Sequence, residues 1–197
     1  METIGPAIGG VNTPVYGAGM TDRLDREDWI TQGLRTLAEE GANALKVGPM
    51  AGRLGVSRGS FYWHFRDIGD FQAQLLRRWQ ERSTDQVIRD LEAAKGEPGR
   101  LKQLMKRAFA DRSRLDRAVR SWAAEDDAVA RIVASVDGRR VAYLTKMLVA
   151  AGVEGRRARH RAAFLYWAYL GQAVVMDRRH SSIPDAAIDD ISGLFEG

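Results

Sequence analysis

The chain has 197 residues, of which 45% are hydrophobic and 28% charged, as in an ordinary soluble globular protein. It contains no cysteine and only three widely separated histidines, which excludes disulfides, thiolate metal sites and cysteine nucleophiles, so we expect neither a metal nor a cofactor. No apolar run reaches the roughly 20 residues of a membrane helix, and the first residues lack the pattern of a secretory signal, so we expect a cytoplasmic protein.

Glycine and proline divide the chain into segments that are compatible with helices. Residues 1–21 are rich in glycine, proline and small residues without periodicity, which predicts a flexible arm. In residues 23–40 the apolar side chains of Trp29 and Leu37 recur at helical spacing, and Gly41 ends the helix. Further helices are predicted over residues 48–54, 57–65, 70–94, 99–113, 115–124, 126–151, 154–179 and 184–195. No alternating strand pattern occurs, so the expected fold class is all-α.

Residues 50–65 (MAGRLGVSRGSFYWHF) have the spacing of a helix-turn-helix unit. Ala51 is small where two helices cross closely, and Gly55 follows four residues later, where the turn needs a left-handed conformation. Ser57 is expected to cap the second helix. The apolar side chains expected to hold the unit together are Met50, Leu54, Val56 and Phe61.

The second helix of such a unit lies in the DNA major groove, with its early residues at base edges and its flanks on phosphates. Arg58 and Ser60 are therefore candidates for base or phosphate contact, and Tyr62 and His64 for contact with the DNA backbone. The net charge of +4 adds only weak support. The complete set of predicted DNA-binding residues is Lys46, Val47, Ser57, Arg58, Gly59, Ser60, Tyr62, Trp63 and His64.

This part of the chain resembles the TetR family of transcriptional regulators. The resemblance runs through residues 29–41 (WITQGLRTLAEEG) and 47–65 (VGPMAGRLGVSRGSFYWHF), and extends over about residues 23–83. It implies a DNA-binding head of three helices over residues 22–69. It also implies a helical ligand-binding and dimerisation domain over residues 70–197, with the fourth helix as the link.

The family resemblance also implies how such a protein works. Its last two helices would pair with those of a second copy, and the homodimer would bind a palindromic operator on double-stranded DNA. A small-molecule effector of unknown identity would bind in the body, change how the fourth helix sits and release the operator. The expected function is thus that of a ligand-responsive regulator, in the first instance a repressor.

Two positions depart from the family pattern. Lys46 stands where many members have threonine or serine, and Pro49 replaces a polar residue, so Gly48 is predicted to cap a helix that begins late. Ile68 stands where the family often has a lysine that meets phosphate, and Lys46 or Arg66 is expected to compensate.

Aromatic and methionine side chains of the body are candidates for an apolar ligand cavity, although at helical spacing they can equally form plain core. They are Trp79, Met105, Phe109, Trp122, Tyr143, Met147, Phe164, Tyr166, Trp167 and Tyr169. The predicted ligand-binding residues among them are Trp79, Phe109, Trp122, Tyr143, Phe164 and Trp167. The many basic residues of the body are interpreted as solvated helix faces, with an acidic effector or an added DNA contact as alternatives.

Two other classes of function compete with DNA-binding regulation. An enzyme would need a nucleophile and base, a phosphate-binding loop or a paired acid set, and the sequence shows none; the acidic run 125–127 fits a helix start instead. A helical protein-interaction module that keeps the head without operator recognition is the alternative, motivated by Ile68. Substitution of Arg58 and Tyr62 would distinguish it from a regulator.

Overall fold

The computed structural model describes residues 24–94, 99–110, 114–172 and 183–196. Every regular element in those ranges is helical, which confirms the all-α prediction. None of the described helices is both long and apolar enough to cross a membrane. The predicted flexible arm, residues 1–21, lies outside the described residues.

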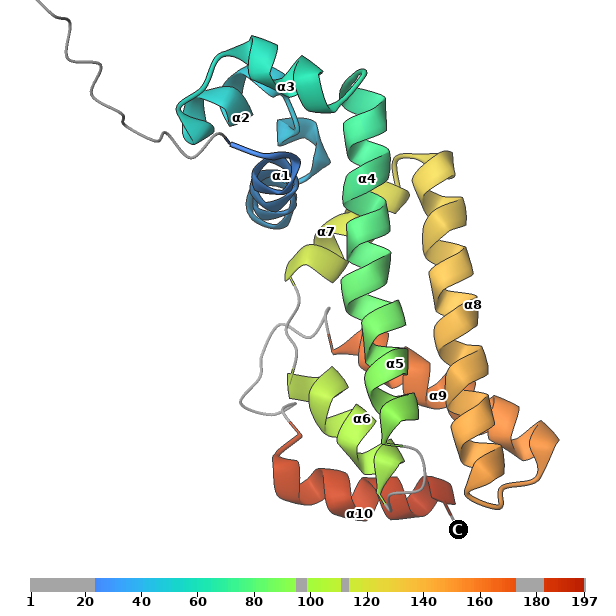
Figure 1. The fold of residues 1–197 in the computed structure, drawn as a ribbon. Coiled ribbons are helices and arrows are strands. Elements are labelled where there is room, and N and C mark those ends of the chain that lie inside the picture. The colour runs from blue at the N-terminus through green and yellow to red at the C-terminus, as the bar shows by residue number, and fades with distance from the viewer. Residues whose placement is uncertain (1–23, 95–98, 111–113, 173–182, 197) are drawn as a thin grey trace, which may run out of the picture.

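The chain forms a helical head at one end of a longer helical body (Figure 1). The head comprises α1 (Arg26–Glu40), the 3-10 turn η1 (Ala42–Ala44), α2 (Val47–Leu54) and α3 (Arg58–His64). The body comprises α4 (Ile68–Gln80), the π-helical turn η2 (Glu81–Asp85), α5 (Gln86–Ala93), α6 (Arg100–Ala110), α7 (Arg114–Ala123), α8 (Asp127–Ala150), α9 (Gly155–Gly171) and α10 (Asp185–Glu196). The column of α4, η2 and α5 starts beside the head and ends near α6, while α10 lies at the far end (Figure 1).

Local signals in the sequence fix both ends of α1. The Asp25 carboxylate accepts hydrogen bonds from the backbone N–H groups of Glu27 and Asp28. The Asp25 N–H in turn donates to the Asp28 carboxylate, which completes a capping box. Gly41 ends the helix with φ at 82°, a conformation that favours glycine. The predicted first helix is therefore confirmed, with its start at Arg26.

The core of the head continues without a break into the body. Trp29 and Leu37 of α1 are fully buried in one cluster with Trp79 of α4, Val119 of α7 and Val136 of α8. α1 packs directly on α7 and α4. A displacement of α4 or α7 must therefore change the packing of α1, because close-packed interiors transmit strain.

Gly33 allows α1 and α4 to approach closely. A Cβ atom at this position would lie 2.4 Å from Phe71 Cζ and 2.9 Å from Leu75 Cδ2, and both of those side chains are fully buried. Phe71 has no easy escape because its ring packs against Phe61 and Phe65, with centroids 5.4 and 4.9 Å away.

Replacing Gly33 with alanine is therefore expected to destabilise the fold by about 1–3 kcal/mol, even though alanine favours a helix interior. The matched control is Gly138→Ala in α8, where an added Cβ meets nothing within 4 Å and is expected to stabilise the protein by up to about 1 kcal/mol. Urea unfolding of both variants checks the pair. An unchanged or increased stability of Gly33→Ala would show that the two helices do not depend on this contact.

The sequence predicted one helix over residues 70–94, and the structure interrupts it. The helix begins two residues earlier, at Ile68, because the Asp67 side chain accepts a hydrogen bond from the Asp70 N–H at 2.7 Å. It then widens into η2, where the Ser83 hydroxyl donates a hydrogen bond to the Trp79 carbonyl oxygen at 2.6 Å. Single π turns inside α-helices are frequent at functional sites.

Candidate functional site

The turn between α2 and α3 has the geometry that its sequence predicts. Gly55 adopts the left-handed conformation with φ at 69°, and the Val56 N–H donates to the Ala51 carbonyl at 3.0 Å. Ala51 is buried where the helices meet. Of the predicted apolar pegs, Met50 and Phe61 are fully buried, while Leu54 and Val56 are half-buried against the same cluster.

An aromatic cluster turns one face of α3 inward and leaves the other on the surface. The ring of Phe61 packs edge-on against Trp29 at 5.2 Å and also contacts the rings of Phe65 and Phe71. The opposite face carries Tyr62 and Trp63, whose side chains are 60% and 83% exposed. Such exposure of two large aromatic residues next to each other is unusual unless the surface meets a partner.

The predicted DNA-binding residues share this surface, and none of the nine is buried. Lys46, Ser57, Arg58, Gly59, Tyr62 and Trp63 are exposed, and Val47, Ser60 and His64 are half-buried. The Arg58 side chain lies against the start of α2, since a Cβ on Gly48 would be 3.0 Å from its Nη2 atom. The structure therefore brings the start of α2 and the start of α3 together.

Two predictions about helix caps are wrong in detail. α2 begins at Val47 with Lys46 as its N-cap, rather than late with Gly48 as the cap. Pro49 is then the third helical residue and costs no hydrogen bond, because the N–H groups of a first turn have no intrahelical partner. Ser57 occupies the N-cap of α3 as expected, but its hydroxyl makes no capping hydrogen bond.

The start of α4 explains the unusual Ile68. Its side chain is half-buried and packs against the core of the head. The adjacent N–H groups are occupied, because the Asp67 carboxylate accepts from the Asp70 N–H and the Asp70 carboxylate accepts from the Arg66 N–H at 3.1 Å. The hydrogen bond from Gln74 and then that from the Arg66 N–H lower the pKa of Asp70. Arg66 is exposed and lies next to this helix end.

Residues 30–71, from α1 to the first turn of α4, match the profile of the family described as bacterial regulatory proteins, tetR family. This segment is a TetR-type DNA-binding domain, and its helix-turn-helix unit is α2 and α3. The chain is a DNA-binding transcriptional regulator of the TetR type.

Comparison of whole structures extends the likeness to the body. The crystal structure of a candidate transcriptional regulator from Streptomyces coelicolor A3(2) is similar, with a TM-score of 0.63 at 19% sequence identity. The similarity covers 86% of this chain and 97% of that one, so the two share a fold throughout. No curated protein matches the sequence.

The body contains a cavity of about 120 Å³ between α5, α6, α8 and α9. Its apolar wall consists of Val87, Ile88, Leu91, Leu104, Met105, Ala108, Phe109, Leu144 and Leu165. Its remaining lining residues are Thr84, Arg107, Arg140, Tyr143, Tyr166 and Tyr169. Of the six predicted ligand-binding residues, the structure places Phe109 and Tyr143 in this wall.

The other four predicted ligand-binding residues lie elsewhere. Trp79 and Trp122 are buried in the core that joins the head to the body. Phe164 and Trp167 are on the outer face of α9, 59% and 68% exposed. The composition of α9 could not separate its two faces, because aromatic residues occur on both: Tyr166 and Tyr169 point inward to the cavity.

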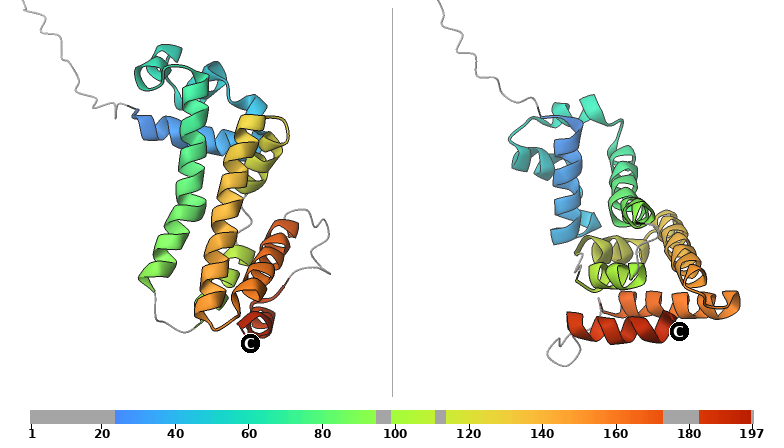
Figure 2. Two further views of the ribbon diagram at one scale, coloured as in Figure 1. Left: turned by 90° about the vertical axis from the view of Figure 1, so that its right-hand side faces the viewer. Right: turned by 60° about the horizontal axis from the view of Figure 1, so that its bottom comes forward.

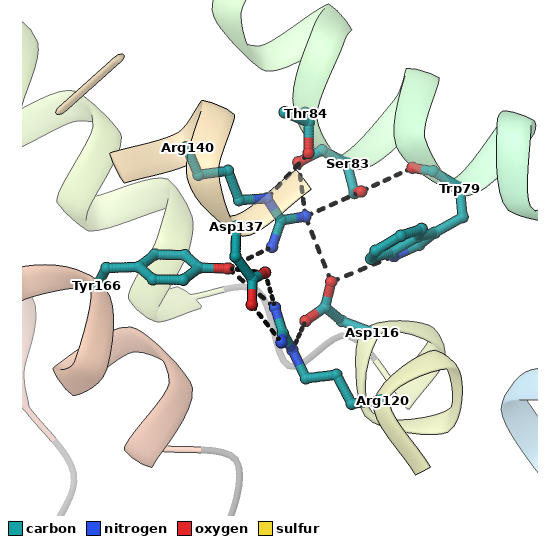
Figure 3. Close-up of polar contacts among 8 residues, drawn as sticks. All are labelled: Trp79, Ser83, Thr84, Asp116, Arg120, Asp137, Arg140 and Tyr166. Carbon is teal, nitrogen blue, oxygen red and sulfur yellow. Dashed lines mark hydrogen bonds and ion pairs between the residues drawn. The ribbon is translucent and has the colours of Figure 1, made fainter. Parts of the chain in front are cut away.

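A buried network of ion pairs joins the cavity to the core (Figure 3). Arg120 donates to both oxygens of Asp137 at 2.7 and 3.1 Å and to Asp116 at 3.1 Å. Arg140 donates to Asp116 at 3.3 Å, and the Tyr166 hydroxyl donates to Asp137 at 2.6 Å. Two cations face two carboxylates, so the charges of the network balance.

The surroundings shift the titration of these groups in ways that keep the pairs charged. Burial alone would raise the pKa of Asp137, but hydrogen bonds from Arg120 and Tyr166 outweigh it and lower that pKa. Burial alone would lower the pKa of Arg120, but its hydrogen bonds to Asp137 outweigh that and raise it. Burial is also the main cause of the raised pKa of Tyr166, whose hydroxyl stays protonated.

The same network also ties the π turn to the neighbouring helices. Arg140 of α8 donates to the Thr84 hydroxyl at 2.9 Å and to the Ser83 hydroxyl and carbonyl at 3.0 and 3.2 Å. Trp79 of α4 donates from Nε1 to Asp116 of α7 at 3.2 Å. The sequence does not predict this network, because the spacings of Asp116 to Arg120 and of Asp137 to Arg140 are equally typical of ion pairs on a solvent-exposed helix face.

Proposed function

We propose that this regulator binds a specific palindromic operator as a homodimer and is released from it by a small molecule, so that it acts as a repressor in the cytoplasm. The observation that carries the proposal is the exposed face of α3 with Arg58, Tyr62 and Trp63, where Arg58 lies against the first turn of α2. When the protein binds its operator in this proposal, α3 enters the major groove with Arg58 and Ser60 near base edges. Tyr62, His64 and Lys46 then lie at phosphates.

Titration of the purified protein onto DNA from upstream of its own gene, at several salt concentrations, tests the operator. We expect a site preference together with a steep fall of affinity with salt, because phosphate contacts release counterions. Binding that ignores sequence, or no binding at low salt, would contradict the proposal.

An apolar face on α9 and α10 supports the homodimer. The two helices run along one side of the body, away from the head (Figure 2), and the rings of Phe164 and Phe195 stack with centroids 6.2 Å apart. Trp167 and Leu194 are 68% and 69% exposed on these helices. A two-fold axis through such a face pairs the same residues of two copies, and the two α3 helices would then read half-sites about 34 Å apart.

Replacing Trp167 with glutamate is expected to weaken dimerisation by about 100-fold or more, because it removes a large aromatic anchor and places two like charges at the two-fold interface. Sedimentation velocity over a concentration series measures the change. Trp63→Glu is the matched control, since it adds the same charge at an equally exposed tryptophan on α3 and should leave the dimer intact. Retention of the dimer by Trp167→Glu would place the interface elsewhere.

The contacts of α4 support a route from the body to the head. Its first turn carries Ile68 and Phe71 in the core of the head, while Trp79 and the adjoining Ser83 join the buried network beside the cavity. The Glu27 carboxylate of α1 also accepts hydrogen bonds from both Nη atoms of Arg78 in α4, at 2.5 and 2.6 Å. These hydrogen bonds lower the pKa of Glu27. A ligand that prefers one position of α4 would therefore change the position of α1 and the separation of the two heads.

A further inference from the structure

The polar lining of the cavity includes two guanidinium groups, those of Arg107 and Arg140. Among the lining residues that the structure describes, none carries a carboxylate. Arg107 is half exposed at 51% and pairs with Asp90 at 2.8 Å, whereas the Arg140 side chain is only 11% exposed. Arg140 is therefore the cation that a ligand inside the cavity would meet.

The hydrogen bonds of Arg140 are unevenly distributed over its three nitrogen atoms. Nε and Nη2 make short contacts with Thr84, Ser83 and Asp116, at 2.9 to 3.3 Å. Nη1, which carries two N–H bonds, has one long contact of 3.5 Å with the Tyr166 hydroxyl. Donor capacity therefore remains on the nitrogen that lies beside Tyr166, itself a lining residue (Figure 3).

We infer that the cavity binds a small aromatic monocarboxylate, with the carboxylate on Arg140 and the ring among Phe109, Tyr143 and Tyr169. A volume of about 120 Å³ suits one ring, since a cavity of about 150 Å³ holds benzene. A buried carboxylate needs a cation with free donors, and a ligand cation would find no counter-charge among the described lining residues. The inference rests on the proposed ligand response and gives that ligand its chemical class.

Arg140 also gives the ligand a means of acting on α4. Its guanidinium lies over the Trp79 and Tyr169 rings, 5.8 Å from each centroid, and it fastens α8 to Ser83 and Thr84 of the π turn. A carboxylate on Nη1 would draw the guanidinium toward the cavity and so weaken the bonds that Nε and Nη2 make to the π turn. The bound state then favours a released π turn, next to the end of α4.

Calorimetric titration of the full-length protein with benzoate and phenylacetate, without DNA, tests the ligand class. Benzamide and benzylamine are the matched neutral and cationic probes. We expect at least one of the two acids to bind about tenfold or more tightly than benzamide, and benzylamine not to bind. Equal binding of benzoate and benzamide, or no binding of either acid, would overturn the inference.

Two variants locate the binding. Arg140→Lys is expected to weaken binding of the acid about tenfold or more, because lysine lacks the planar fork. Arg139→Lys is its control, since Arg139 pairs with Asp85 on the surface of the same helix. Ala108→Leu fills the cavity without touching the buried network and should abolish binding even if the Arg140 variant does not fold. Unchanged binding by Ala108→Leu would overturn the assignment of the cavity.

Operator binding measured with and without the acid separates this inference from the proposed function. An acid that binds as expected but leaves operator affinity unchanged confirms the ligand class and contradicts release by the ligand. A chain that fails to bind any operator contradicts the proposed function, and the calorimetry with the acids still decides the inference.

Discussion

Replacing Arg58 with alanine is expected to weaken operator binding by about 10- to 100-fold, which corresponds to the 1–3 kcal/mol of a good arginine contact with DNA. Arg58 is the first residue of α3, is exposed, and lies over Gly48 at the start of α2. The variant would therefore lack the positive charge that lies between the N-termini of α2 and α3. Fluorescence anisotropy with a labelled operator fragment measures the change.

The salt dependence distinguishes what Arg58 contacts. If its guanidinium meets phosphate, the variant should bind all sequences more weakly and the slope of log affinity against log salt should fall by about one unit. If it meets a base edge, the slope should hold and the preference for one operator position should relax. Tyr62→Ala is expected to weaken binding by a smaller factor, since an aromatic hydroxyl at phosphate carries no charge.

Lys102→Ala is the matched control for these variants. It removes one positive charge from α6, at the other end of the molecule from α3, and should leave operator affinity unchanged (Figure 1). Normal operator binding by both Arg58→Ala and Tyr62→Ala, together with capture of a protein partner, would favour the interaction module over the regulator.

The head could be predicted from the sequence because its signals are local. The left-handed Gly55, the small Ala51 and the buried Phe61 all act within 16 residues, and the structure places each as expected. The prediction that Gly48 caps α2 is wrong, because the helix begins at Val47, and Gly48 lies against Arg58 of the next helix.

The body was predicted at the level of helices and not at the level of its site. α9 carries aromatic residues around its circumference, so its pattern does not show which side faces inward. Its orientation is set by packing on α8, and that packing turns Tyr166 into the cavity and Trp167 outward. The buried network likewise joins four helices that are distant in the sequence, and spacing within one helix gives no signal of such pairings.

Replacing Asp116 with alanine is expected to cost about 3–5 kcal/mol of stability, because removal of one partner leaves buried charges uncompensated. Asp116 is 6% exposed and accepts hydrogen bonds from Arg120, Arg140 and the Nε1 atom of Trp79. All three donors would lose this acceptor at a site where the Arg120 and Arg140 side chains are only 24% and 11% exposed. For a chain of this length, the loss corresponds to a fall in Tm of roughly 10 °C.

Thermal unfolding followed by circular dichroism measures the fall, with Asp189→Ala as the control. Asp189 of α10 also bridges two cations, Lys102 and Lys106, but its side chain is 47% exposed, so water replaces the lost contacts and Tm should hardly move. Asp116→Asn should fall between the two, since its amide oxygen still accepts from Trp79 while the charge is lost. Equal Tm values for Asp116→Ala and the unsubstituted protein would mean that the two arginines find other partners. The network could then not hold α4, α7 and α8 in one arrangement.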